Sequence, residues 1–247
     1  MRTLKATEPS PAGPSSENVL VSMVEAIKHD IIFGRLRPRE RLIEDELSAR
    51  FGASRHVIRS AFVELERIGL VTRRPNKGAV VRDFSVREVE EIYDMRSILQ
   101  AEAVRRIPMP VSAEVLAAVE AVHARYCDAV DRRDLKEVCT INNEFHRTIF
   151  AACNSKYLAD IIDRMWTETL AIRCYAIGDP LLLQRSRSEH TKIVQALKSG
   201  DRETLVRVPV EHIYPAFEAY KRAHGGWMTD EPAAAPRPRP EIVAAKG

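Results

Sequence analysis

The chain has 247 residues, enough for one large domain or two small ones with a buried core. Its apolar fraction of 45% and charged fraction of 30% are ordinary for a globular protein, and the sequence contains no long apolar run, so a membrane protein is not expected. The net charge is only +3, but residues 35–82 contain twelve Arg or Lys and six Asp or Glu. The charge of this segment is typical of a polyanion-binding module on a more neutral body.

Both ends of the chain, residues 1–17 and 226–247, are rich in Pro, Ala, Ser or Gly and are expected to be disordered tails. The amino terminus lacks the charged and apolar regions of a secretory signal, and the four cysteines show no CxxC spacing. The sequence therefore predicts a cytoplasmic protein.

Residues 18–84 read as three helices followed by a β-hairpin. The first helix fits residues 18–33, and the second lies in LIEDELSARFG, which ends at Gly52. The third covers residues 55–68, follows the N-capping Ser54, and has apolar residues at the spacing of one buried helical face.

Two short β-compatible runs come next, GLVTR and GAVVR, joined by the turn-forming RPNK. Arg73, Arg74 and Lys77 lie near the tip of this predicted hairpin. Helix, helix, turn, helix and basic hairpin is the layout of a winged helix-turn-helix domain, whose wing would carry these cations to DNA.

Arg55, His56 and Arg59 gather at the amino end of the third helix, where the helix dipole disfavours positive charge. A DNA-recognition helix enters the major groove by this end. Arg55 and Arg59 lie on one face, away from the apolar stripe of Ile58 and Phe62, and a guanidinium group matches guanine or a phosphate. A solvated arginine face is the alternative, but it explains neither the preceding helix and turn nor the basic hairpin that follows.

A family resemblance is carried by the stretch GRLRPRERLIEDELSARFGASRHVIRSAFVELERIGLVTRRPNKGAVV. It resembles the DNA-binding domain of the GntR family of bacterial transcription regulators, in which G-x-L-x-P-G, L-x-E-x-x-L-A and a glycine in the wing recur. Arg39 stands where the family usually has glycine, and His56 and Val57 stand for Thr and Pro. The resemblance implies DNA contacts at Arg35, Ser54, Arg55, His56, Arg59 and Gly78.

The remaining segment, residues 85–225, has no strand signal and is expected to form an all-α antiparallel bundle of about six helices. Apolar stripes mark helices near Ile92–Ala103 and Val115–Tyr126, and further helices fit residues 134–153, 157–177, 181–199 and 201–223. The segment resembles the ligand-binding FCD domain of one GntR subgroup.

Several polar residues lie on the apolar stripes of this bundle. Asn142 and His146 share a face of one helix, whereas His190 and His212 lie on two others. A single histidine of this kind is more often a core residue than a ligand, but three on inward faces suit a divalent metal such as Zn or Ni.

The FCD resemblance implies the same residues. Many FCD domains have D-x-x-x-H, then E-H, then a late histidine, and their metal helps to hold a small carboxylate effector. His146, His190 and His212 match the histidine positions, and Asn142 replaces the usual Asp, which should weaken metal binding. Pro209 removes a helical hydrogen bond, so a kink is expected just before His212.

Two arginines are candidates to bind the effector carboxylate. Arg96 lies on an inward stripe, where an unpaired guanidinium would be costly. It is expected to form either a buried salt bridge or a fork for the carboxylate of the effector. Arg173 is a second candidate, on the face of Trp166 and Leu170.

The sequence thus predicts a dimeric transcription factor, and the GntR resemblance implies repression as its mode. It would bind palindromic operator DNA and respond to a small organic acid. Two alternatives remain. In the first, the bundle is a metal-dependent hydrolase attached to a DNA anchor, which would need a general base near the metal; neither Glu144 nor Glu189 is expected on the inward stripe. In the second, the protein is an architectural DNA-binding protein without an effector.

Overall fold

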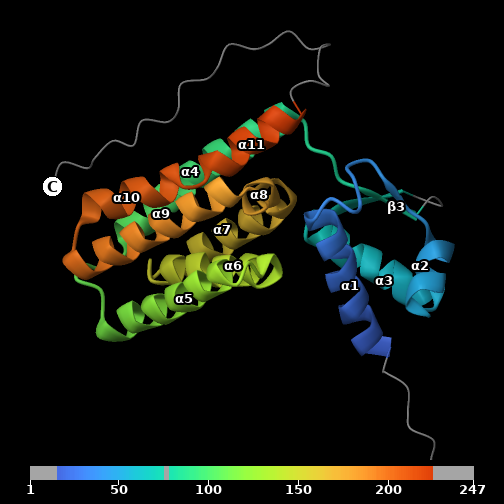
Figure 1. Cartoon of the computed structure of the whole chain (residues 1–247), viewed down its shortest axis with the longest axis horizontal. Coiled ribbons are helices and arrows are strands. Elements are labelled where there is room, and N and C mark those ends of the chain that lie inside the picture. Colours follow the sequence, from blue (N-terminus) through green and yellow to red (C-terminus); the bar gives the residue numbers. More distant parts are fainter. Residues whose placement is uncertain (1–15, 75–77, 225–247) are drawn as a thin grey trace, which may run out of the picture. The chain divides into compact units, whose positions relative to one another are not determined.

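The computed structural model describes residues 16–74 and 78–224 (Figure 1). The chain divides into two compact units at the junction of Arg82 and Asp83. The two predicted terminal tails lie outside the described residues, except for residues 16 and 17, which begin the first helix. Lys77, at the predicted tip of the wing, also lies outside them.

The first unit contains three helices and three short strands among its described residues. In chain order these are α1 (Ser16–Ile32), β1 (Arg41–Leu42), α2 (Glu44–Phe51), α3 (Arg55–Arg67), β2 (Val71–Arg74) and β3 (Gly78–Val81). This is the predicted winged helix-turn-helix, and its fold class is confirmed.

The apolar stripe of α3 forms the core of this unit. Ile58, Phe62 and Leu65 are at most 2% exposed, and α3 packs against α1. The helix begins where predicted, because the hydroxyl group of Ser54 accepts a hydrogen bond from the backbone N–H of Val57. Burial of this stripe leaves the opposite face of α3 to solvent.

The wing is a three-stranded antiparallel sheet in the order β1-β3-β2. β1 was not predicted from the sequence, because two residues are too short to display a strand period. It pairs Leu42 with Ala79, and so joins the chain ahead of α2 to the wing. The described part of the wing is therefore held on both sides of β3.

Two positions in this unit have left-handed backbone. Gly78 has a φ of +76°, and a Cβ atom there would lie 2.7 Å from the carbonyl oxygen of Leu42, so glycine is required by close approach as well as by conformation. Arg39 has a φ of +67°. Glycine adopts this conformation without a steric penalty, so Arg39 stands at a position that favours glycine.

The second unit is all helical among its described residues, as predicted. Its elements are α4 (Val86–Arg106), α5 (Ala113–Asp131), α6 (Leu135–Ala151), α7 (Lys156–Glu168), α8 (Leu170–Ile177), α9 (Pro180–Ser199), α10 (Arg202–Glu211) and α11 (Tyr214–His224). Eight helices stand where about six were expected, because two predicted helices are each interrupted.

The first interruption separates α7 from α8 at Thr169. This residue is fully buried, and its hydroxyl group lies 3.0 Å from the carbonyl oxygen of Met165 and 3.2 Å from that of Trp166. A threonine hydroxyl that bonds back to the preceding turn competes with the regular helical pattern and bends the helix. The same hydroxyl receives a hydrogen bond from Arg96, so this irregular position is tied to α4.

The second interruption lies at His212 and Ile213, between α10 and α11. Pro209 is inside α10 and does not end it. Pro215 lies in the first turn of α11, where a proline is well tolerated, and it has no N–H to donate to the carbonyl group of Glu211, which disfavours one continuous helix. Where the sequence predicted a kink at Pro209, the helix instead ends at His212, three residues further along the chain.

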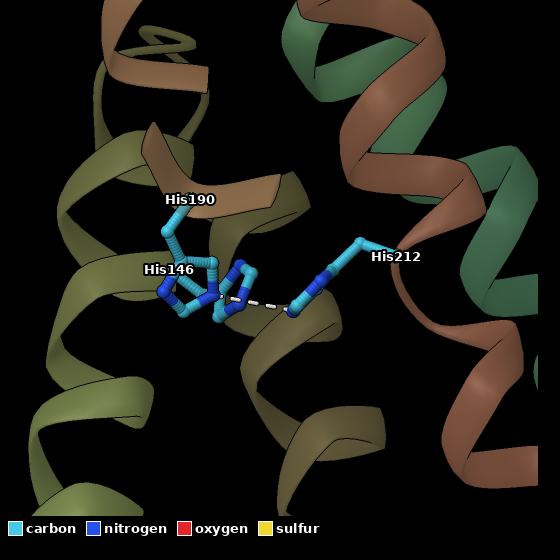
Figure 2. Close-up of side chains that lie close together, drawn as sticks. All are labelled: His146, His190 and His212. Carbon is cyan, nitrogen blue, oxygen red and sulfur yellow. Dashed lines mark hydrogen bonds between the residues drawn. The ribbon is translucent and has the colours of Figure 1, made fainter. Parts of the chain in front are cut away.

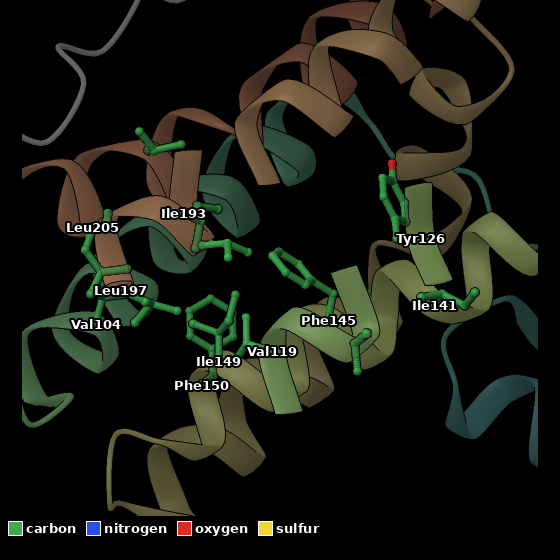
Figure 3. Close-up of a cluster of buried hydrophobic side chains, with 14 of the residues drawn as sticks. Val104, Val119, Tyr126, Ile141, Phe145, Ile149, Phe150, Ile193, Leu197 and Leu205 are labelled. Carbon is green, nitrogen blue, oxygen red and sulfur yellow. The ribbon is translucent and has the colours of Figure 1, made fainter. Parts of the chain in front are cut away.

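The core of the bundle is formed by α5, α6 and α9 with contributions from α4 and α10 (Figure 3). Phe145, Ile149 and Ile193 are at most 1% exposed within it. α6 packs against α5 and α7, and α9 packs against α5 and α10. Within the described ranges, no helix has the length and apolar character needed to span a bilayer.

Candidate functional site

Three histidines from separate parts of the bundle meet in its interior (Figure 2). His146 comes from α6, His190 from α9, and His212 follows directly after α10. One ring nitrogen from each lies within 4.8 Å of those of the other two, and Nε2 of His190 is 3.2 Å from Nε2 of His212. The helix end after Pro209 therefore does not keep His212 away from the other two histidines.

Glu189 orients His212, although the sequence pattern placed this glutamate outside the inward stripe. Its Oε2 atom lies 2.7 Å from Nδ1 of His212, and its Oε1 atom accepts a hydrogen bond of 2.7 Å from Nε of Arg185. A carboxylate at this distance keeps the proton on Nδ1, so Nε2 of His212 presents a lone pair to the cluster. Glu189 lies off the fully buried stripe of α9, as expected, but it still reaches the site, because the interruption after α10 brings His212 to it.

The carboxylate group of Glu189 is charged at neutral pH. Burial alone would raise the pKa of Glu189, but hydrogen bonds from His212 and Arg185 outweigh that effect, and the pKa is lowered. Glu144, the other glutamate considered, forms an exposed ion pair with Arg125 instead.

The two inner imidazoles are neutral. Burial holds the pKa of His146 well below its ordinary value, with smaller contributions from His190, His212, Arg173 and Arg96. Burial also lowers the pKa of His190 strongly. A neutral imidazole is the form that binds a metal ion.

One pair of the cluster has the spacing of ligands to a divalent ion. Two nitrogen ligands at about 2.0–2.1 Å from one tetrahedral ion lie about 3.3 Å apart, close to the 3.2 Å separation of His190 and His212. The three nitrogens together lie within 4.8 Å, so the rings would have to close by about an ångström to hold one ion. Nε2 of His146 is buried with no hydrogen-bond partner, which is costly unless something binds there. Asn142, the predicted fourth ligand, is 8% exposed and lies one turn before His146 on the same face of α6.

Arg96 is the most unusual residue near this cluster. It is 2% exposed, and Nη1 donates to Thr169, whereas Nε and Nη2 are buried without a hydrogen-bond partner. Among the described residues no carboxylate pairs with it, so the first of the two alternatives for Arg96, a buried salt bridge, is not present. Burial lowers the pKa of Arg96, Tyr93 and Tyr214 act in the opposite direction, and an arginine remains protonated at neutral pH. The two unpartnered nitrogens are the adjacent pair that can hold a carboxylate in bidentate fashion.

Trp166 connects the two arginines and the histidine cluster. The guanidinium carbons of Arg96 and Arg173 lie 4.8 Å and 4.2 Å from the centroid of its ring, and the ring of His146 lies 4.3 Å away. Arg173 donates to Oδ1 of Asn143, which also accepts from Nε1 of Trp166. Arg173 is therefore fixed in place beside Arg96.

Arg96, Arg173 and His212 line one pocket, together with Asn142, Trp166 and Glu189, whereas His146 and His190 are not part of its lining. The space inside the pocket is about 50 Å³, enough for a few water-sized groups, and the pocket opens to solvent. Polar groups directed to one region suit the polar end of a small molecule, such as a carboxylate.

On the first unit, the exposed face of α3 carries the predicted DNA contacts. Arg55 and Arg59 have side chains that are 66% and 68% exposed, and His56 is exposed beside them. Arg59 lines a groove between α3 and the wing, together with His56, Arg73, Arg74 and Gly78. Arg73 is held against α3 by Glu66, whose carboxylate accepts from both the backbone N–H and Nε of Arg73.

Arg35 lies in the loop after α1 and is 70% exposed, and its Nη1 atom pairs with Asp30 at 3.0 Å. Asp30 is nearly buried and also pairs with Arg50 of α2. Ser54 is exposed at the amino end of α3, where its side chain acts as the cap. The close contact of Gly78 with Leu42 gives this glycine a structural role in addition to any contact with DNA.

The two units match two known families. Residues 21–81 match the family described as bacterial regulatory proteins, gntR family, and residues 91–214 match the FCD domain. The chain belongs to the GntR family of transcription regulators and carries an FCD domain, as the sequence motifs indicated. Its relatives are regulators and not enzymes.

Similar proteins extend over most of the chain. The HTH-type transcriptional repressor RspR of Escherichia coli K12 is 22% identical over 231 residues, which cover 91% of this chain and 98% of RspR. The regulator McbR of the same organism is 24% identical over 203 residues, which cover 79% of this chain and 91% of McbR.

Solved structures show the same fold. The structure of E. coli McbR/YncC matches with a TM-score of 0.68 at 21% identity, and covers 83% of this chain and 98% of that one. A GntR regulator from Rhodococcus sp. RHA1 matches with a TM-score of 0.67 at 22% identity and the same coverage.

Proposed function

We propose that this regulator represses transcription from a palindromic operator, and that a small carboxylate bound beside a divalent metal in the FCD domain controls its affinity for DNA. The metal would be held by His146, His190 and His212, with Zn or Ni suited to imidazole ligands. Asn142 would add a carbonyl oxygen. The ion, when bound, would offer open coordination positions to an oxygen of the effector.

The observation that carries the effector proposal is the unpartnered edge of Arg96. A buried guanidinium with no carboxylate partner is costly, and its Nε and Nη2 atoms form a ready fork. The same pocket is lined by His212, so one carboxylate ligand could reach both the arginine and the metal. Arg173, fixed beside Trp166, adds a second positive charge.

Repression and dimerisation rest on other grounds. RspR is named a repressor, and a relative from Paenarthrobacter nicotinovorans is named a probable repressor of a D-xylose utilization operon. One recognition helix covers only a few base pairs, so two copies on a two-fold operator are needed for specificity. α4 begins at Val86, directly after the junction of the two units, and carries Arg96, which gives effector binding a short route to the DNA-binding unit.

One observation favours the hydrolase alternative: a glutamate that could serve as general base, Glu189, lies next to His212. Both of its oxygen atoms are already engaged, by His212 and by Arg185, so it serves better as an orienting group than as a general base. Together with the family membership, this favours a regulator.

Metal analysis of the purified protein, followed by a thermal-shift screen of organic acids with and without chelator, tests this proposal. About one divalent ion per chain is expected, together with stabilisation by an acid that depends on the ion. A metal-free protein that no acid stabilises would contradict the effector proposal.

Replacing Arg59 with alanine tests the DNA contact. The change should cost roughly 1–3 kcal/mol of operator binding and relax the preference at one base pair, because a bidentate arginine–guanine contact would be lost. Operator affinity is measured at fixed salt on duplexes selected by the wild-type protein. Arg67→Ala, which removes an exposed arginine from the carboxyl end of the same helix, is the control. Unchanged operator affinity in Arg59→Ala would contradict the assignment of α3 as recognition helix.

Replacing Glu189 with glutamine tests its role as an orienting group. The amide is nearly the same size but no longer fixes the proton on Nδ1 of His212, so metal affinity should fall about 10–100-fold. Competition with a chromogenic chelator measures the affinity directly. Glu144→Gln is the matched control, since Glu144 is exposed and paired with Arg125. Equal metal affinity in both variants would show that Glu189 does not support the site.

A further inference from the structure

Two acidic residues at the start of α2 pair with two arginines at the start of α3, in different ways. Glu44 forms a two-point fork with Arg59, in which Nε lies 3.1 Å from Oε1 and Nη2 lies 3.3 Å from Oε2. Asp45 makes a single contact with Arg55, between Oδ1 and Nη2 at 3.0 Å. Only the first pair fixes the plane of its guanidinium group.

Burial separates the two pairs further. The side chain of Glu44 is 22% exposed, whereas that of Asp45 is 76% exposed. An exposed, single-point ion pair contributes little and is easily replaced. Glu44 is held by its surroundings, so its fork is the more persistent contact.

The fork leaves part of the Arg59 guanidinium group available. A guanidinium has a side edge, formed by Nε and Nη2, and an end edge, formed by Nη1 and Nη2. Glu44 takes the side edge, and Nη1 bonds to no described residue. The end edge can still form two parallel hydrogen bonds to O6 and N7 of guanine.

We propose that Glu44 is a specificity residue, which directs the end edge of Arg59 to a base and prevents Arg59 from acting as a general phosphate contact. This inference rests on the proposed role of α3 as the recognition helix. Phosphate contacts strengthen binding to every sequence, whereas base contacts distinguish one sequence from another. A carboxylate beside the guanidinium neutralises its charge and repels phosphate, but leaves its hydrogen-bond donors for guanine.

The position of Glu44 on the surface supports this role. Two grooves of the first unit are lined by Glu44, Arg59 and Gly78 together, one toward α3 and the wing and one toward β1 and Arg55. A phosphate that approaches Arg59 from either groove therefore meets the carboxylate of Glu44.

The test compares an operator duplex, selected from a random pool by the wild-type protein, with a scrambled duplex of the same length. Glu44→Gln should tighten binding to the scrambled duplex, and the ratio of the two affinities should fall roughly tenfold. The salt dependence of scrambled-duplex binding should become steeper, by about 0.9 in log–log slope for each arginine freed. Glu46→Gln removes the same charge from the same helical turn, forms no ion pair with the described residues, and should leave the ratio unchanged.

A double-mutant cycle with Arg59→Ala separates this inference from the proposed function. Glu44→Gln should have no further effect on the ratio in the Arg59→Ala background, because its action passes through that arginine. If Arg59→Ala alone does not weaken operator binding, the recognition-helix proposal fails. If Arg59→Ala weakens operator binding, two results would still overturn the role of Glu44 alone. One is that Glu44→Gln lowers the affinity ratio no more than Glu46→Gln does. The other is that Glu44→Gln lowers the ratio equally in the Arg59→Ala background. Circular dichroism of each variant establishes that it is folded.

Discussion

Arg96→Ala is expected to abolish the response of operator binding to the effector while operator binding itself and metal content stay as in the wild type. The reason is that the unpartnered Nε and Nη2 atoms of Arg96 form the proposed carboxylate fork. A ligand shifts DNA affinity only through its different affinity for two arrangements of the protein. The coupling is reciprocal and typically worth about 1–3 kcal/mol. Calorimetric titration of an acid identified by the screen, with and without operator DNA, measures it from both directions.

Two further variants sharpen this experiment. Arg96→Lys keeps the positive charge but lacks the planar fork, so it should also lose most of the response. Arg106→Ala removes an exposed arginine from the same helix and should keep it. An effector response of wild-type size in Arg96→Ala would mean that the carboxylate binds elsewhere.

His190→Ala is expected to lower the bound divalent metal from about one ion per chain to well below that. His190 is fully buried and lies 3.2 Å from His212, so its loss leaves only two of the three imidazoles. Elemental analysis of protein purified without a metal-binding tag gives the metal content. Operator binding by the His190→Ala variant should persist, because His190 belongs to the second unit and the DNA contacts belong to the first.

His123→Ala is the matched control for this experiment. His123 is half-buried on α5, where it contacts Thr191, and it is not part of the cluster. His212→Ala, at a less buried position, provides a second test if the loss of His190 destabilises the bundle. Equal metal content in the wild type and both cluster variants would contradict the histidine site.

The parts of the fold that repeat over many residues could be predicted from the sequence. The buried stripe of α3 and its Ser54 cap are set by local spacing and local hydrogen bonds, and both are confirmed. β1 could not be predicted, because its two residues form a strand only by pairing with β3, far along the chain. The divisions at Thr169 and at His212 depend on a buried hydroxyl group and on a proline beyond the helix end, which an apolar period does not reveal.

The candidate site shows the same limit. His146, His190 and His212 could be proposed together because each lies on an inward stripe, and the structure brings them within reach of one ion. Glu189 was set aside because its own helix turns it from that stripe. Its partner, His212, comes to it from the irregular segment after α10, a tertiary contact with no signal in the local sequence.

The chain leaves the first unit from β3, which is the middle strand of its sheet. Its separation from the sheet breaks the hydrogen bonds of two ladders, to β1 and to β2, whereas an edge strand has only one ladder to lose. The end of the DNA-binding unit that joins the rest of the chain is thus anchored twice, and local unfolding that begins at the junction has to break both ladders.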